Sequence, residues 1–125
     1  LIQFMALCLD FFKENNSSKK MTVLVATSGD TGGAVANGFS GTKDIDVCIL
    51  YPKGKISEVQ EKQITTNSSF VQAIEVEGDF DLCQSMVKNA FNDNDINQKI
   101  SLTSANSINV ARGLPQMFYY FLEIK

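Results

Sequence analysis

Short apolar stretches alternate along this chain with stretches whose apolar residues recur at the helical period. The apolar stretches predict β-strands at residues 21–27, 45–51, 70–76 and 100–103. The periodic stretches predict helices at 1–15, 32–40, 57–66 and 80–91, and a last helix that ends near residue 125. Strands that alternate with helices are joined by right-handed crossovers into a parallel sheet. We therefore expect a single α/β domain over residues 1–125, a three-layer αβα fold with a small parallel sheet of about four strands.

Local signals mark several of the predicted helix ends. Ser57, with Gln60 three residues later, forms a capping-box pattern, and Asp79 is placed to cap the next helix. Pro115 is expected to kink or break the last helix, because it lacks an N–H and crowds the carbonyl of Ala111.

The first predicted helix, 1–15, is apolar nearly all round, which predicts burial within a longer protein of which this chain is a segment. Its apolar run is too short for a membrane span and is interrupted by Gln3 and Asp10. The basic residues that open a signal peptide do not precede it. We therefore expect no membrane partner and a cytoplasmic location, with a plastid as the alternative in a photosynthetic source.

The composition argues against several kinds of site. The sequence of 125 residues has a net charge of −3 and a single arginine, Arg112. It therefore lacks the cluster of basic residues that binds nucleic acid. Histidine is absent, which removes the commonest metal ligand and the usual general base, and we expect no metal site. The cysteines, Cys8, Cys48 and Cys83, are widely spaced in apolar surroundings, so we expect reduced core residues of an intracellular protein.

The glycine-rich loop Thr27–Ala34 is the strongest candidate for a ligand site. It lies between a predicted strand and a predicted helix, where backbone N–H groups can surround an anion. The hydroxyls of Ser28 and Thr31 add donors, and glycine lets a ligand approach the backbone. The loop lacks the Gly-x-Gly-x-x-Gly spacing of dinucleotide-binding folds and the Gly-Lys-Ser/Thr ending of a nucleotide P-loop. The alternative is a plain turn in which Ser28, Asp30 or Thr31 only caps the helix.

Asp30 restricts what this loop can bind. A fixed carboxylate repels a bound anion at short range. Asp30 should therefore face something other than the anion, such as a polar ring substituent or the backbone, or else serve as the N-cap of the helix. The residues alone favour neither possibility.

A second candidate, Ser104–Arg112, also follows a predicted strand and opens a helix. It gathers hydroxyls, amides and an arginine, whose planar guanidinium suits bidentate capture of phosphate or carboxylate. Because loops after parallel strands emerge at one edge of the sheet, both candidates can face one ligand. The alternative is a capped helix with a surface arginine. The turn Tyr51–Lys55 shares this edge but is more typical of a solvated turn, and the aromatic residues at 117–121 are more typical of core or domain packing.

Three motifs in this order resemble the threonine synthase family: Ala-Thr-Ser-Gly-Asp-Thr-Gly-Gly-Ala at 26–34, Tyr-Pro-Lys-Gly-Lys at 51–55 and Ser-Ala-Asn-Ser-Ile-Asn-x-x-Arg at 104–112. Glu-Lys-Gln at 61–63 and Pro-Gln-Met-Phe-Tyr-Tyr-Phe at 115–121 are similar to the same family. The resemblance covers nearly the whole chain. It implies the small, Rossmann-like, substrate-binding domain and the adjoining helices of a fold-type-II enzyme. Such an enzyme uses pyridoxal 5′-phosphate to convert O-phospho-L-homoserine and water to L-threonine and phosphate.

The resemblance also implies which residues bind the substrate. They lie in two loops: Thr27, Ser28, Gly29, Thr31, Ser107, Asn109 and Arg112. The first loop would bind the substrate carboxylate, while Ser107 and Arg112 would hold its phosphate with Asn109 nearby. Asp30, which stands where many relatives have asparagine, would lie beside the phenolic oxygen of the cofactor.

Other parts of such an enzyme are implied to lie outside this chain. A Phe-Lys-Asp motif ahead of Leu1 would supply the Schiff-base lysine, and a second glycine-rich loop beyond Lys125 would hold the cofactor phosphate. We therefore expect no catalytic residue within the chain, no activity from the chain alone, and the rest of the parent chain as its partner. Gly113 departs from the family, in which a larger residue is common there. The alternatives are a non-catalytic relative that binds a phosphorylated amino acid and a nucleotide-binding Rossmann domain.

Overall fold

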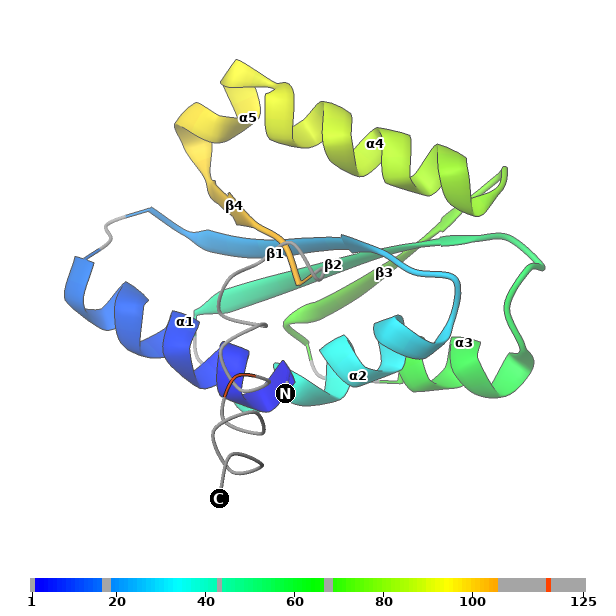
Figure 1. Cartoon of the computed structure of the whole chain (residues 1–125), viewed down its shortest axis with the longest axis horizontal. Coiled ribbons are helices and arrows are strands. Elements are labelled where there is room, and N and C mark those ends of the chain that lie inside the picture. Colours follow the sequence, from blue (N-terminus) through cyan, green and yellow to red (C-terminus); the bar gives the residue numbers. More distant parts are fainter. Residues whose placement is uncertain (1, 17–18, 43, 67–68, 106–116, 118–125) are drawn as a thin grey trace.

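The structure, a computed structural model, describes residues 2–16, 19–42, 44–66, 69–105 and 117 (Figure 1). In chain order the elements are α1 (Ile2–Asn16), β1 (Met21–Ala26), α2 (Asp30–Gly38), β2 (Ile45–Pro52), α3 (Glu58–Thr65), β3 (Val71–Val76), α4 (Phe80–Asn92), α5 (Asn94–Lys99) and β4 (Ser101–Thr103). Apart from residue 117, the predicted last helix, with its proline, lies outside the described residues.

The described strands form one parallel sheet in the order β3-β2-β1-β4, between a layer of α1, α2 and α3 and a layer of α4 and α5 (Figure 1). This confirms the predicted three-layer α/β fold. The chain steps from β1 to β2 to β3 in one direction, with α2 and α3 on one face. It then returns past β1 to β4 by way of α4 and α5 on the opposite face, because right-handed crossovers in opposite directions must cover opposite faces.

Each face of the sheet has its own apolar core. Val23 and Val25 of β1 pack with Phe39 on the side of α1 and α2. Leu24, which points the other way, packs with Cys83 of α4. β1 is buried on both faces because it lies between two strands and two helix layers, which is why its sequence is continuously apolar. β3 lies at the edge of the sheet and exposes several of its residues.

The predicted helix caps at Ser57 and Asp79 are confirmed. Ser57 Oγ accepts a hydrogen bond from the N–H of Gln60 at 3.2 Å, and Gln60 Oε1 accepts one from the N–H of Ser57 at 3.0 Å, which completes the capping box of α3. Asp79 Oδ1 accepts from the N–H of Leu82 at 2.8 Å at the start of α4.

Two helices differ from the prediction. α2 begins at Asp30, two residues earlier than expected, so the glycines of the candidate loop lie partly within its first turn. α5 was not predicted. It is short and begins after Asp93, whose Oδ1 accepts from the N–H groups of Asp95 and Ile96 at 2.9 and 3.1 Å.

α1 buries one side and exposes apolar residues on the other. Its buried residues are Ile2, Met5 and Ala6, and its exposed ones are Phe4, Leu7, Phe11 and Phe12. The expected burial of this second side within a longer protein stays a prediction. Within the described residues, no helix has the length and apolar character needed to cross a membrane.

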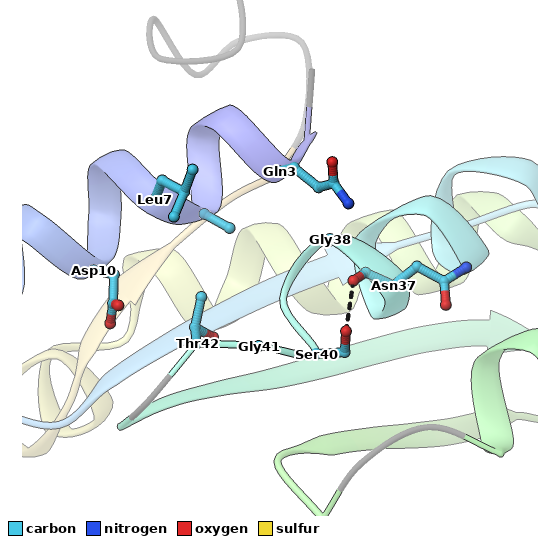
Figure 2. Close-up of a pocket in the computed structure, with 9 residues that line it drawn as sticks. Gln3, Leu7, Asp10, Asn37, Gly38, Ser40, Gly41 and Thr42 are labelled. Carbon is cyan, nitrogen blue, oxygen red and sulfur yellow. Dashed lines mark hydrogen bonds between the residues drawn. The ribbon is translucent and has the colours of Figure 1, made fainter.

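A pocket of about 300 Å³ lies between α1 and the turn that follows α2 (Figure 2). Gln3 and Asp10 of α1 line it together with Asn37 and Thr42. Thr42 precedes β2, so the pocket is at the edge of the sheet where the strands begin. It is therefore separate from the glycine-rich loop, which follows the end of β1.

Candidate functional site

The strand order places both candidate loops at a topological switch point. α2 carries the chain away from β1 to one side, and α4 and α5 bring it to β4 on the other side. β1 and β4 are parallel neighbours, with Val23 opposite Thr103, so the loops that follow them leave the same edge, as predicted. Ligands of open α/β sheets bind at the carboxyl ends of the strands at such a point.

Thr27 organises the glycine-rich loop from within. Its side chain is 1% exposed, and its Oγ1 accepts hydrogen bonds from the N–H groups of Gly29 at 3.0 Å and Gly32 at 2.9 Å. The N–H of Thr27 donates to the carbonyl of Leu50 at 2.9 Å, which ties the loop to β2. The hydroxyl oxygen of Thr27 is thus committed to the loop, and its contribution to binding acts through the shape of the loop.

Gly29 is the N-cap of α2 and adopts a φ of 138°, a conformation that favours glycine. It offers no side-chain cap, so the alternative in which Ser28, Asp30 or Thr31 caps the helix is wrong. The capping acceptor comes instead from Thr27, two residues before the N-cap.

The outward groups of the loop suit an anion at the helix start. Ser28 and Asp30 are exposed and Thr31 is half-buried. The N–H groups of Asp30 and Thr31 belong to the first turn of α2, which offers them no acceptor within the helix. Since the N–H of Gly29 is directed to Thr27, the donors for a ligand are the hydroxyls of Ser28 and Thr31 and this first turn.

Asp30 is held by a residue from another helix. Its Oδ1 accepts a hydrogen bond from Nε2 of Gln60, in the first turn of α3, at 2.7 Å. The sequence had predicted a polar ring substituent, the backbone or an N-cap role for Asp30, and the partner observed within this structure is instead a side-chain amide. Sequence reasoning identified Gln60 only as a capping residue and missed this second contact.

The other glycines of the loop allow α2 to pack closely on α3. A Cβ added at Gly32 would lie 2.7 Å from Cγ2 of Thr27 and 2.9 Å from Cδ1 of Ile64. A Cβ added at Gly33 would lie 3.0 Å from Oε1 of Gln63. Gly32 is therefore tightly packed between Thr27 and α3, and Gly33 lies close to the flexible side chain of Gln63, whereas the sequence had suggested the approach of a ligand.

The turn after β2 directs its first lysine away from the candidate loop. Lys53 Nζ lies 3.2 Å from Oε1 of Glu77 and 3.8 Å from Oε1 of Glu75, at the end of β3. Tyr51 is buried and donates a hydrogen bond to Oε1 of Glu61 at 3.3 Å. Burial, and then the charge of Glu61, raise the pKa of the Tyr51 hydroxyl, so it stays protonated near neutral pH. The predicted solvated turn therefore fits Lys53, Gly54 and Lys55, which are exposed, whereas Tyr51 and Pro52 are buried residues at the end of β2.

The second candidate loop is described only at its start. Ser104 is half-buried and Ala105 is buried in the core beside β1. Ser107, Asn109 and Arg112 lie outside the described residues, so their predicted roles stay predictions. Across the described part of the chain, no group of three His, Cys, Asp or Glu side chains is arranged to hold a metal ion.

Comparison with known proteins points to one family. No protein-family model matches the chain. Its sequence is 54% identical over 107 residues to the threonine synthase of Buchnera aphidicola subsp. Acyrthosiphon pisum, a match that covers 86% of this chain and 25% of that protein. It is 54% identical over 102 residues to the threonine synthase of Haemophilus influenzae, covering 82% of this chain and 24% of that protein.

Comparison of the fold with solved structures points to the same family. The chain matches a crystal structure of PLP-bound threonine synthase from Brucella melitensis with a TM-score of 0.87 and 42% sequence identity, covering 98% of this chain and 26% of that one. The chain thus spans about a quarter of the length of the relatives that it matches, and it is similar to that quarter in both sequence and fold.

Proposed function

We propose that this chain is a segment of a threonine synthase, a lyase that depends on pyridoxal 5′-phosphate (PLP). Such an enzyme converts O-phospho-L-homoserine and water to L-threonine and phosphate, and we expect it in the cytosol. The observation that carries the proposal is the similarity to a quarter-length segment of threonine synthases, at 54% identity in sequence and a TM-score of 0.87 in structure.

In this proposal the segment recognises the substrate at two ends. The hydroxyls of Ser28 and Thr31 and the first turn of α2 bind the carboxylate, which the positive end of the helix favours. Ser107 and Arg112, with Asn109 nearby, hold the phosphate, as the family resemblance implies. The support from the structure is that the strands preceding these loops are neighbours, so the two loops start at one edge of the sheet.

The residues present fit PLP at one position. Bound PLP would supply an electron sink for the elimination of phosphate and the addition of water. Asp30 is an exposed carboxylate, so it can accept a hydrogen bond from a protonated phenolic oxygen of the cofactor. The same carboxylate would repel the cofactor phosphate. Neither candidate loop contains a lysine, so a covalent link to PLP must come from elsewhere in the protein.

The test is turnover by the full-length protein. With PLP and O-phospho-L-homoserine, we expect threonine and inorganic phosphate to appear in equal amounts, measured by chromatography and a phosphate assay. Homoserine, which has no phosphate leaving group, should give no threonine.

The other outcomes identify the alternatives. Binding of O-phospho-L-homoserine without turnover would replace the proposal with a non-catalytic relative. Calorimetric binding of NAD, without binding of the phosphorylated amino acid, would replace it with a nucleotide-binding domain.

A further inference from the structure

The side chain of Gln60 makes hydrogen bonds at both ends of its amide group. Oε1 accepts from the N–H of Ser57 at 3.0 Å and from Ser57 Oγ at 3.1 Å, while Nε2 donates to Asp30 Oδ1 at 2.7 Å. The orientation of the amide follows from its partners, because a backbone N–H can only donate and a carboxylate can only accept. Gln60 therefore links the capped start of α3 to the first residue of α2.

The backbone at Gly29 is adapted to this link. A Cβ added at Gly29 would lie 2.6 Å from both Cδ and Nε2 of Gln60, and the φ of 138° is one that L-amino acids rarely adopt. The amide of Gln60 therefore lies directly against the backbone of the loop, beside the carboxylate that it holds.

From these contacts we propose that Gln60 is a positioning residue that fixes the direction of the Asp30 carboxylate at the ligand site. The proposal rests on the proposed function. The capping box anchors Gln60 to α3, and close packing of Gly32 on Ile64 holds α3 against α2. Asp30 is exposed, so without this partner its side chain would sample several rotamers, and ligand binding would have to order it.

The exchange of Gln60 for glutamate separates its two contacts. Glutamate serves the capping box as well as glutamine does, so Gln60→Glu keeps an acceptor for the N–H of Ser57. It replaces the donor that faces Asp30 with a negative oxygen. In the full-length protein we expect about tenfold weaker binding of O-phospho-L-homoserine, measured by calorimetry in the presence of PLP, because like charges would meet at hydrogen-bonding distance.

The same exchange made in a protein that already carries Asp30→Asn shows whether the effect of Gln60→Glu acts through Asp30. In Asp30→Asn, the side-chain amide can donate to a glutamate at position 60, so adding Gln60→Glu should change binding by less than about twofold. The melting temperature of the same four proteins gives a readout that needs no substrate. We expect Gln60→Glu to lower it when Asp30 is present and to leave it unchanged in the Asp30→Asn background.

Two single variants serve as controls. Gln63→Glu adds the same charge three residues further along α3, where the side chain faces Gly33, and should leave binding unchanged. Ser57→Ala removes the capping hydroxyl but keeps the bond to Asp30, so it should lower the melting temperature with little effect on binding.

Each outcome decides a different question. Equal losses of binding from Gln60→Glu in both backgrounds would overturn the positioning role. Coupling between positions 30 and 60 in melting temperature but not in binding would also overturn it, because the contact would then be structural only. A wild-type protein that does not bind O-phospho-L-homoserine would overturn the proposed function, and the coupling in melting temperature would still report whether the contact exists.

Discussion

Replacement of Thr27 with valine is expected to have two effects: the glycine-rich loop opens more readily, and O-phospho-L-homoserine binds more weakly. Valine keeps the shape of threonine but has no oxygen, so the N–H groups of Gly29 and Gly32 lose their acceptor. Both glycines are buried, and each buried N–H without a partner costs about 1–3 kcal/mol. We expect the free energy of opening the loop to fall by at least about 2 kcal/mol, seen as roughly 30-fold faster amide hydrogen exchange over residues 27–34 of the full-length protein.

The chain offers a matched control for this change. Thr42 is also buried and its hydroxyl donates to the carbonyl of Phe39 at 2.8 Å, but the N–H of Thr42 donates to the same carbonyl at 3.1 Å. Thr42→Val therefore leaves no group unpaired and should affect neither the loop nor binding. Thr27→Ser keeps the oxygen and should protect the amides nearly as well as threonine. Unchanged exchange over 27–34 in Thr27→Val would show that the hydroxyl does not organise the loop.

Most of the fold follows from local patterns in the sequence, because its strands and helix caps are set by near neighbours. Ser57 and Asp79 each bond to a backbone N–H three residues later, within the range that a sequence pattern covers. α5 escaped prediction because its start depends on one capping residue, Asp93, within a polar stretch with no apolar period.

The position of the candidate site was predictable, but its internal structure was not. A strand, a glycine-rich turn and a helix predicted the loop at 27–34. The sequence could not show that Gly29, Gly32 and Gly33 face side chains of α3, since these lie about thirty residues further along the chain, beyond β2, and are brought to the loop by the tertiary fold. The strand order that places the switch point between β1 and β4 was likewise outside the reach of local patterns.

Replacement of Arg112 with alanine is expected to weaken binding of O-phospho-L-homoserine far more than binding of homoserine. The proposal assigns Arg112 to the substrate phosphate, and a guanidinium forms two charge-assisted hydrogen bonds to such a group. Loss of a charge-assisted interaction costs on the order of 2 kcal/mol or more, which corresponds to about 30-fold in the dissociation constant. Homoserine lacks the phosphate, so its affinity should stay within about twofold. Calorimetric titration of the full-length protein with both ligands measures the difference.

A second cation separates a direct contact from the general effect of charge. Lys53→Ala removes one positive charge from the same edge of the sheet, but Lys53 already pairs with Glu75 and Glu77, and exposed pairs of this kind contribute little. We expect its effect on either ligand to stay within about twofold. Equal weakening of both ligands by Arg112→Ala would remove Arg112 from the phosphate end of the site. An equal effect from Lys53→Ala and Arg112→Ala would mean that the overall charge of this edge, and no specific contact, favours the phosphate.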